Sequence, residues 1–277
     1  MNGADLKIKI QNGEIIYGTM LSVSRNPRWV ESIAKLGLDY LIIDTEHSPL
    51  GRSEVADLLA IFKLTAIVPI VRIPIPDSHY ATMAIDAGSQ GVLAPYCETV
   101  EQVEEIVSAC KWRPLKGEFV NNIIKHQKFP SEETKLYLEN KNKDNLCIIG
   151  IESVPAINNL DDILSIDGID AIFVGPNDLT ISLGIPDQYD HPEYKSAVKY
   201  IIDKSKSKGI PTLVHQQTVE LTKEWIENGS TFVLYSSDSR MINPFVNEID
   251  YIKSIGNQIL GKNHQKIGDL EDLGDVI

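Results

Sequence analysis

The chain has 277 residues, of which 43% are hydrophobic and 23% are charged, a composition typical of a folded globular protein. Its formal net charge of -13 argues against a nucleic-acid partner, because a nucleic-acid surface needs clustered lysine and arginine. No apolar run is long enough to predict a signal peptide or a membrane span. The three cysteines have neither paired nor metal-type spacing, so a reducing cytoplasm is the simplest compartment.

Short apolar segments recur along the chain, and each is typical of a strand buried on both faces. We expect strands, in chain order, at 15–23, 39–43, 67–71, 91–95, 146–151, 171–174, 211–214 and 231–235. Apolar residues at helical spacing predict helices at 26–36, 52–64, 77–88, 98–110, 154–164, 193–208, 219–227 and 241–260. Eight strands that alternate with eight helices over this chain length predict an α/β fold, a single-domain (β/α)8 TIM barrel. A two-domain Rossmann-type enzyme is the alternative, but no G-x-G-x-x-G follows any of these strands.

The barrel is expected to span residues 1–262, with an acidic C-terminal tail at 263–277. The alternation lapses in a long inserted loop at about 111–145, where only a short helix near 131–139 is predicted. A connection of this length inside a compact domain is usually functional. We therefore interpret it as a lid or a binding loop.

Charged and polar side chains follow the predicted strands where each strand ends. Barrel enzymes place their chemistry at the C-terminal ends of strands. Burial of a charge without partners is costly, so charges at these points need an explanation. The strand-end residues are, in chain order, Asp44, Glu46, His47, Arg72, Glu152, Asp178, His215 and Gln216.

Glu152 and Asp178 lie one βα unit apart, each just beyond a strand. Two converging carboxylates without cysteine or several histidines suit a hard divalent ion such as Mg²⁺ or Mn²⁺. The alternative is that one of them caps the following helix.

Arg72 is a fixed cation suited to a carboxylate or to a developing enolate oxygen, unless it forms a structural salt bridge. His47 can act as a general base if a carboxylate orients it, and Asp86, Asp44 and Glu46 are the candidates. The alternative is a solvated loop histidine.

These motifs resemble those of a known family. The segment Leu38-Asp39-Tyr40-Leu41-Ile42-Ile43-Asp44-Thr45-Glu46-His47 resembles the D-x-x-x-I-D-x-E-H segment of the HpcH/HpaI class II pyruvate aldolases. The other motifs of this family are matched, in order and spacing, by Val71-Arg72, by residues 86–91 (DAGSQG), by Ile151-Glu152-Ser153 and by residues 174–179 (VGPNDL). The similarity covers roughly residues 18–242.

The resemblance implies an aldolase that cleaves or forms a carbon–carbon bond of a 4-hydroxy-2-oxo acid through a metal-bound pyruvate enolate. Its partners would be a keto acid, pyruvate, and an aldehyde. The cofactor would be a divalent metal ion, Mg²⁺ or Mn²⁺, with Co²⁺ as a further candidate. A Schiff-base aldolase would need a lysine on a strand, and the predicted strands carry none.

The resemblance also implies roles for individual residues. Glu152 and Asp178 would bind the ion, and Arg72 would steady the enolate oxygen. His47, paired with Asp86, would exchange a proton with the substrate hydroxyl. Asp44 would support the part of the site around His47.

The chain departs from the family pattern at three places. Thr45 stands where the family often has glycine, and Gly150 stands where it usually has glutamine. The G-x-R-G turn has become residues 117–120 (GEFV), which lack its arginine and second glycine. An oxaloacetate-type decarboxylase or a CoA-thioester lyase of the same superfamily is therefore an alternative. A non-catalytic barrel that binds a keto acid is another.

A homo-oligomer built from dimers, a hexamer among them, is also expected from the resemblance. The predicted last helix agrees with it, because apolar residues between Phe245 and Ile255 give that helix a face for a neighbouring subunit.

Overall fold

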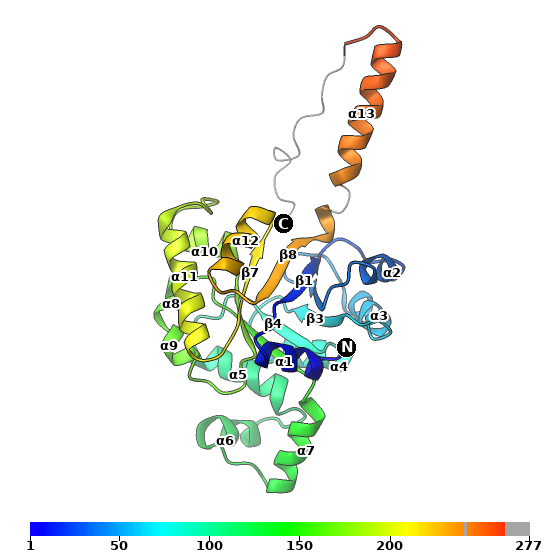
Figure 1. The fold of residues 1–277 in the computed structure, drawn as a ribbon. Helices are drawn as coiled ribbons and strands as arrows, with labels where there is room; N and C mark the ends of the chain where they lie inside the picture. Colours follow the sequence, from blue (N-terminus) through cyan, green and yellow to red (C-terminus); the bar gives the residue numbers. More distant parts are fainter. Residues whose placement is uncertain (241–242, 264–277) are drawn as a thin grey trace.

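The structure is a computed structural model, and it describes residues 1–240 and 243–263. Eight parallel strands close into a barrel in chain order, with β8 paired to β1 (Figure 1). The predicted (β/α)8 TIM barrel is confirmed. The strands are β1 Ile16–Leu21, β2 Tyr40–Asp44, β3 Val68–Arg72, β4 Gly91–Ala94, β5 Leu146–Gly150, β6 Ala171–Val174, β7 Thr212–Gln216 and β8 Phe232–Ser237.

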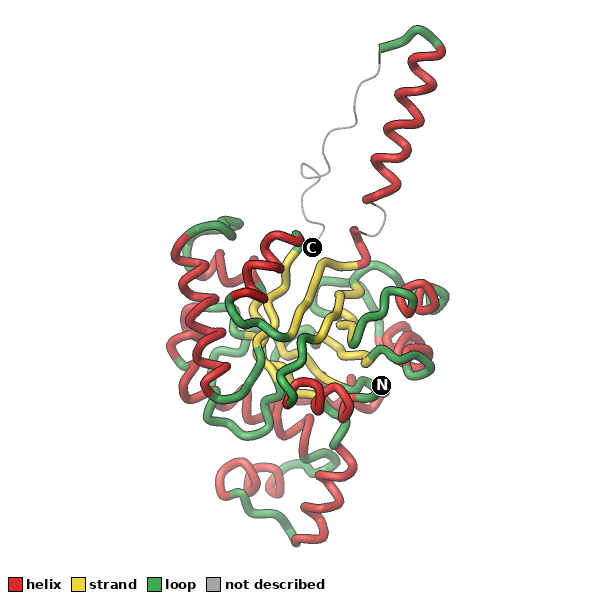
Figure 2. Tube along the Cα trace, in the orientation of Figure 1, coloured by secondary structure: helices red, strands yellow, loops and turns green. Residues whose placement is uncertain are grey.

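Helices surround the strands, as Figure 2 shows. None of the described helices is long and apolar enough to cross a membrane. They are α1 Gly3–Gln11, α2 Trp29–Ala34, α3 Arg52–Phe62, α4 Ser78–Ala87, α5 Val100–Lys111, α6 Glu118–His126, α7 Glu132–Asn142, α8 Val154–Asn158, α9 Leu160–Ile163, α10 Pro176–Ser182, α11 Pro192–Ser207, α12 Val219–Glu227 and α13 Asn243–Ile259, with a 3₁₀ turn, η1, at Asp238–Arg240.

Strand alternation builds two apolar cores, because successive side chains of a strand point to opposite faces. Tyr40 and Ile42 of β2 point inward and belong to the cluster that fills the barrel, and Leu6 of α1 closes its N-terminal end. Leu41 and Ile43 point outward and pack in the cluster between strands and helices. The same alternation directs the next inward residue of β2 into the mouth at the C-terminal ends of the strands.

The segment 111–145 folds into α6 and α7 rather than into a loop with one helix. It connects the C-terminus of α5 to the first residue of β5, so it lies at the N-terminal end of the barrel. A contact with α1 supports this position: Lys7 Nζ donates to the carbonyl oxygen of Lys143 at 2.9 Å. Within one chain this position does not allow the segment to be a lid over the strand ends, and its interpretation as a binding loop stays a prediction.

Several other predicted helices differ from the observed ones in their bounds. The helix predicted from residue 26 begins at Trp29, because the Asn26 side chain accepts the N–H of Arg28 and forms a turn instead. The helix predicted at 154–164 is divided into α8 and α9. Helices α1, α6 and α10 were not predicted from the sequence. The start of the predicted last helix, at 241–242, and the acidic tail from residue 264 lie outside the described residues.

The outer wall is uncovered where β8 meets β1. In a (β/α)8 barrel the helix after β8 normally covers this seam. Here α13 has no buried residue and extends away from the barrel (Figures 1 and 2). Tyr17 of β1 and Tyr235 of β8 point outward and are 48% and 40% exposed. The described chain thus leaves both the seam and the apolar face of α13 without a partner element.

Candidate active site at the carboxyl ends of the strands

A buried ion pair forms the centre of the mouth. Asp44 and Arg72 are register partners at the ends of β2 and β3, and both are buried. Arg72 Nε donates to Oδ1 of Asp44 at 2.8 Å, and its Nη2 donates to Oδ2 at 2.7 Å. Burial alone would raise the pKa of Asp44, but the hydrogen bonds and charge of Arg72 outweigh burial and hold it below its ordinary value. The carboxylate is therefore ionised.

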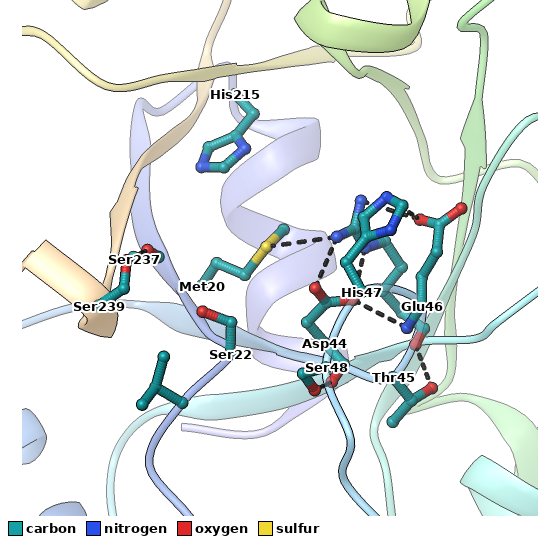
Figure 3. Close-up of polar contacts among 12 residues, drawn as sticks. Met20, Ser22, Asp44, Thr45, Glu46, His47, Ser48, His215, Ser237 and Ser239 are labelled. Atoms are coloured by element: carbon teal, nitrogen blue, oxygen red, sulfur yellow. Dashed lines mark hydrogen bonds and ion pairs between the residues drawn. The ribbon is translucent and has the colours of Figure 1, made fainter. Parts of the chain in front are cut away.

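The turn after β2 brings Glu46 and His47 back to this pair (Figure 3). Asp44 accepts the N–H of Glu46 at 3.0 Å, and the Ser48 hydroxyl donates to the carbonyl oxygen of Asp44. Oε2 of Glu46 lies 2.9 Å from Arg72 Nη1 and 3.6 Å from His47 Nε2. Burial raises the pKa of Glu46 to about 7, despite the opposing charge of Arg72. Glu46 is the carboxylate that stands next to the imidazole.

His47 is a half-buried imidazole with its side chain 37% exposed. Burial and the positive charge of Arg72 both lower its pKa. Its ring is therefore neutral near pH 7 and able to accept a proton.

Asp86 does not pair with His47 within this chain. It lies on the last turn of α4 with its side chain 64% exposed, and its Oδ1 is 2.8 Å from Nη2 of Arg113. The reason is topological: α4 runs along the outside of the barrel and carries Asp86 away from the strand end where His47 lies. The role expected for Asp86 is not supported by its position in the single chain.

Glu152 follows β5 and is 1% exposed. One carboxylate oxygen, Oε2, accepts the N–H of Tyr96, whose φ of 48° places it in the left-handed region. The other, Oε1, has no hydrogen-bond partner among the described residues. Burial raises the pKa of Glu152 to about 8, against the opposing effect of the Tyr96 N–H. A buried carboxylate with an open oxygen is suited to a cation.

Two glycines make room for this carboxylate. A Cβ on Gly175 would lie 2.0 Å from Oε1 of Glu152, and a Cβ on Gly150 would lie 2.6 Å from Oε2. Glu152 in its observed position is therefore incompatible with a side chain at Gly175. Gly150, which stands where the family usually has glutamine, likewise leaves room for the carboxylate in this position.

Asp178 is the third residue of α10, which begins with Pro176 at its first position. Its charge contributes to the raised pKa of Glu46 and of Glu152, so the three carboxylates share one electrostatic environment. No group of three described His, Cys, Asp or Glu side chains could hold a metal ion. An ion bound here would have two protein carboxylates and take water and substrate oxygens in its other positions, as Mg²⁺ commonly does. The residues present fit such an ion, because Oε1 of Glu152 is buried and open.

Residues from β7 and β8 complete the mouth. His215 points inward on β7, whereas Gln216 points outward, with its Nε2 3.4 Å from the hydroxyl of Tyr194. Asp238 is buried after β8 and accepts backbone N–H groups from the segment 22–24 at distances from 2.7 Å. It thereby fixes the loop that leaves β1. Asp238 was not among the predicted site residues, because a linear sequence pattern gives no signal of these N–H contacts.

Comparison with known proteins identifies the family. Residues 19–244 match the model of the HpcH/HpaI aldolase/citrate lyase family. The chain belongs to this family. The resemblance inferred from the motifs is thus confirmed, and the match spans all eight strands except the first residues of β1.

Relatives and solved structures agree with the family. The chain is 30% identical, over 232 residues, to a 2-dehydro-3,6-dideoxy-6-sulfogluconate aldolase from Pseudomonas putida, covering 84% of this chain and 90% of the relative. It resembles the crystal structure of an HpcH/HpaI aldolase from Desulfitobacterium hafniense with a TM-score of 0.77 and 27% identity, covering 90% of this chain and 96% of that one. The citrate synthase SbnG is similar at a TM-score of 0.77 and 26% identity, covering 91% and 98%.

Proposed function

We propose that this protein is a class II aldolase, a carbon–carbon lyase that acts on 4-hydroxy-2-oxo acids through the enolate of pyruvate. The observation that carries the proposal is the open Oε1 of buried Glu152, which shares one electrostatic environment with Asp178 and the Asp44–Arg72 pair. An enolate needs nearby positive charge, and this mouth combines a fixed guanidinium with a carboxylate pair suited to a divalent ion.

Glu152 and Asp178 would hold the ion, Mg²⁺ or Mn²⁺, with Co²⁺ as a further candidate. Bound there, it would supply positive charge that stabilises the enolate. The Tyr96 N–H holds one oxygen of Glu152 and so orients the other.

Arg72 binds and orients the keto acid. Asp44 fixes its guanidinium through Nε and Nη2, so the charge cannot swing away when the substrate binds. Nη1 remains on the side of Glu46. In this buried position the guanidinium faces the oxygen on which negative charge develops, without reorganisation during the reaction.

His47 moves the proton. In cleavage it takes the proton of the C4 hydroxyl, the C3–C4 bond breaks, and its electrons remain on the pyruvate half as the enolate while the aldehyde leaves. The enolate then takes up a proton at C3 to give pyruvate, and His47 releases the proton that it accepted. The neutral ring of His47 makes it able to accept that proton, and the Glu46 carboxylate beside Nε2 orients it.

The likeness to a citrate synthase supports a second candidate, in which the same enolate chemistry serves another acceptor or a decarboxylation. The acceptor half of the site differs between these reactions, whereas the enolate half is shared.

The functional unit is a homo-oligomer built from dimers, and it acts in the cytoplasm. Two apolar surfaces support the assembly: the β1–β8 seam with Tyr17 and Tyr235, and the exposed face of α13. Burial of one against the other in a second copy would cover both. The three free, buried cysteines agree with a reducing compartment.

The decisive experiment measures pyruvate release from a panel of 4-hydroxy-2-oxo acids, with and without Mg²⁺, Mn²⁺ or Co²⁺, and includes oxaloacetate. We expect metal-dependent pyruvate release from at least one hydroxy-oxo acid. Release from oxaloacetate alone would favour the decarboxylase. No turnover of any member, together with retained binding of pyruvate, would favour a non-catalytic keto-acid-binding barrel.

A further inference from the structure

His215 lies in the mouth of the barrel but has no role in the proposed mechanism. It alternates with Leu213, a residue of the barrel interior, and is the last inward-facing residue of β7. Figure 3 shows Met20 between His215 and Asp44. Sδ of Met20 in turn lies 3.7 Å from Nη2 of Arg72. His215 therefore borders the same mouth as the Asp44–Arg72 pair, on the other side of Met20.

A carbonyl oxygen orients the ring of His215. Nε2 lies 3.1 Å from the carbonyl oxygen of Ser236, and Nε2 of Gln217 is farther away, at 3.5 Å. Because a carbonyl oxygen only accepts, this contact favours the tautomer protonated at Nε2, with the lone pair on Nδ1. Ser236 has a φ of 56°, a left-handed backbone that a non-glycine residue adopts at a cost. The turn after β8 thus holds the carbonyl that fixes the imidazole, as a general base requires.

The proposed cleavage needs proton transfer at a second atom. His47 takes the proton of the C4 hydroxyl, whereas pyruvate forms only when C3 of the enolate gains a proton. Other charged groups of the mouth already have a role: Asp44 accepts from Arg72 with both oxygens. Glu152 and Asp178 would hold the ion. Proton transfer at C3 therefore calls for a group that none of these roles uses.

The expected position of the keto acid indicates where this group lies. Pyruvate carries all its oxygens on C1 and C2, and the groups expected to bind them, Arg72, Glu152 and Asp178, follow β3, β5 and β6. C3 carries no oxygen, so we expect it to face the remaining arc of the barrel, from β7 through β8 to β1. Among the described residues, the inner faces of these three strands carry one titratable side chain, His215, and its neighbours in the barrel interior are apolar.

We propose that His215 is a second proton-transfer residue, which carries the proton to and from C3 of the keto acid. With bound pyruvate, Nδ1 of the neutral ring takes a proton from the methyl group, and the electrons of the C–H bond remain on pyruvate as the enolate. The reverse step returns a proton to C3. In cleavage, the ring first takes up a proton from water and then donates it to C3, while His47 releases its own proton to water. The inference rests on the proposed function, because the enolate forms there beside Arg72.

The test is proton exchange at the methyl group of pyruvate, followed by NMR in heavy water with Mg²⁺. His215→Gln keeps a side-chain N–H for the carbonyl of Ser236 but removes the base, so exchange should slow by ~10²–10⁴-fold. Calorimetry should show nearly unchanged affinity for pyruvate, which separates proton transfer from binding. His47→Ala should retain most of the exchange. The matched control, His79→Gln, removes an exposed histidine of α4 and should change neither quantity.

Chemical rescue distinguishes a missing base from a disturbed structure. His215→Ala should exchange slowly, and imidazole added to the solution should restore part of the exchange. Imidazole should not accelerate exchange in Arg72→Ala, where positive charge rather than a base is missing. Circular dichroism checks that each variant is folded, and His215→Ala with imidazole carries the test if His215→Gln is not.

Each outcome decides the proposal. Exchange at the wild-type rate in His215→Gln overturns the role of His215 and leaves the aldolase function standing. An equal loss of exchange and of pyruvate affinity also overturns it, because His215 then binds the keto acid rather than moving its proton. Imidazole without effect on His215→Ala overturns it as well. A wild type that binds pyruvate but shows no exchange overturns both proposals, because no enolate then forms.

Discussion

Arg72 holds Asp44 through two parallel hydrogen bonds, from Nε to Oδ1 at 2.8 Å and from Nη2 to Oδ2 at 2.7 Å. The two residues are register partners on β2 and β3, so the barrel itself fixes the pair. The third nitrogen, Nη1, lies 2.9 Å from Glu46. The guanidinium is thus held rigidly at the mouth, and its charge is available to the substrate without rearrangement.

Isotope exchange should distinguish the role of His47 from that of Arg72. His47→Ala should slow carbon–carbon cleavage by ~10²–10⁴-fold, as for loss of a general base, with pyruvate binding nearly unchanged. Arg72→Ala should damage both cleavage and enolisation, because both develop charge beside the guanidinium. NMR in heavy water follows proton exchange at the pyruvate methyl group. Equal loss of exchange and cleavage in both variants would contradict this division of labour.

Glu152→Gln and Asp178→Asn should leave the fold intact and abolish metal-dependent activity, because each removes one of the two carboxylates expected to hold the ion. Calorimetry with Mn²⁺ should show the loss of binding directly. Asp86→Asn is the matched control, since Asp86 lies outside the mouth, and it should bind Mn²⁺ normally. Wild-type turnover at low metal in either site variant would refute the metal assignment.

Gly175→Ala tests the space around Glu152. The added Cβ would lie 2.0 Å from Oε1, so the carboxylate must move and Mn²⁺ affinity should fall by at least about 10-fold, one broken contact to the ion. Gly256→Ala is the control, because a Cβ there would meet no described atom within 4 Å beyond its chain neighbours and its own helix backbone. Unchanged Mn²⁺ affinity in Gly175→Ala would show that Glu152 does not bind the ion from this position.

Stability without metal should decrease as the pH rises. The pKa of Glu152 is raised from 4.5 to about 8, so between these values the unfolded chain has lost a proton that the folded chain keeps. The unfolded state then binds fewer protons, and this group lowers the free energy of unfolding by about 1.4 kcal/mol per pH unit. Urea unfolding of EDTA-treated protein from pH 5 to 8 measures it. Glu152→Gln should show a shallower slope, and parallel slopes would disprove the shift.

An exposed aromatic residue of α13 should hold the oligomer together. Tyr251 is 68% exposed on α13, and Tyr251→Asp should shift the assembly toward monomers, because a buried unpaired charge is costly at an interface. Tyr137→Asp, on α7, is the matched control at 56% exposure and should leave the mass unchanged. Light scattering at micromolar concentration gives both masses. A monomeric wild type would remove the assembly altogether.

The sequence by itself determined the barrel. Eight apolar runs separated by amphipathic helices can bury their faces in few ways, and the family motifs fixed the order of the strand-end residues. It also identified Asp44, His47, Arg72 and Glu152 as residues of one end, because parallel strands of a barrel end at one face. Helix α10 was missed because Gly175 and Pro176 at its start indicate a turn. Helix α6 contains neither glycine nor proline, and the helical spacing of its apolar residues was overlooked.

Only the tertiary structure decided which of these groups meet. Strand register brings Arg72 onto both oxygens of Asp44, and the turn after β2 places Glu46 rather than Asp86 beside His47. The open oxygen of Glu152 depends on the absence of a side chain at Gly175, which is distant in the sequence. Contacts of this kind arise from packing between elements, and a linear pattern of apolar and polar residues does not record them.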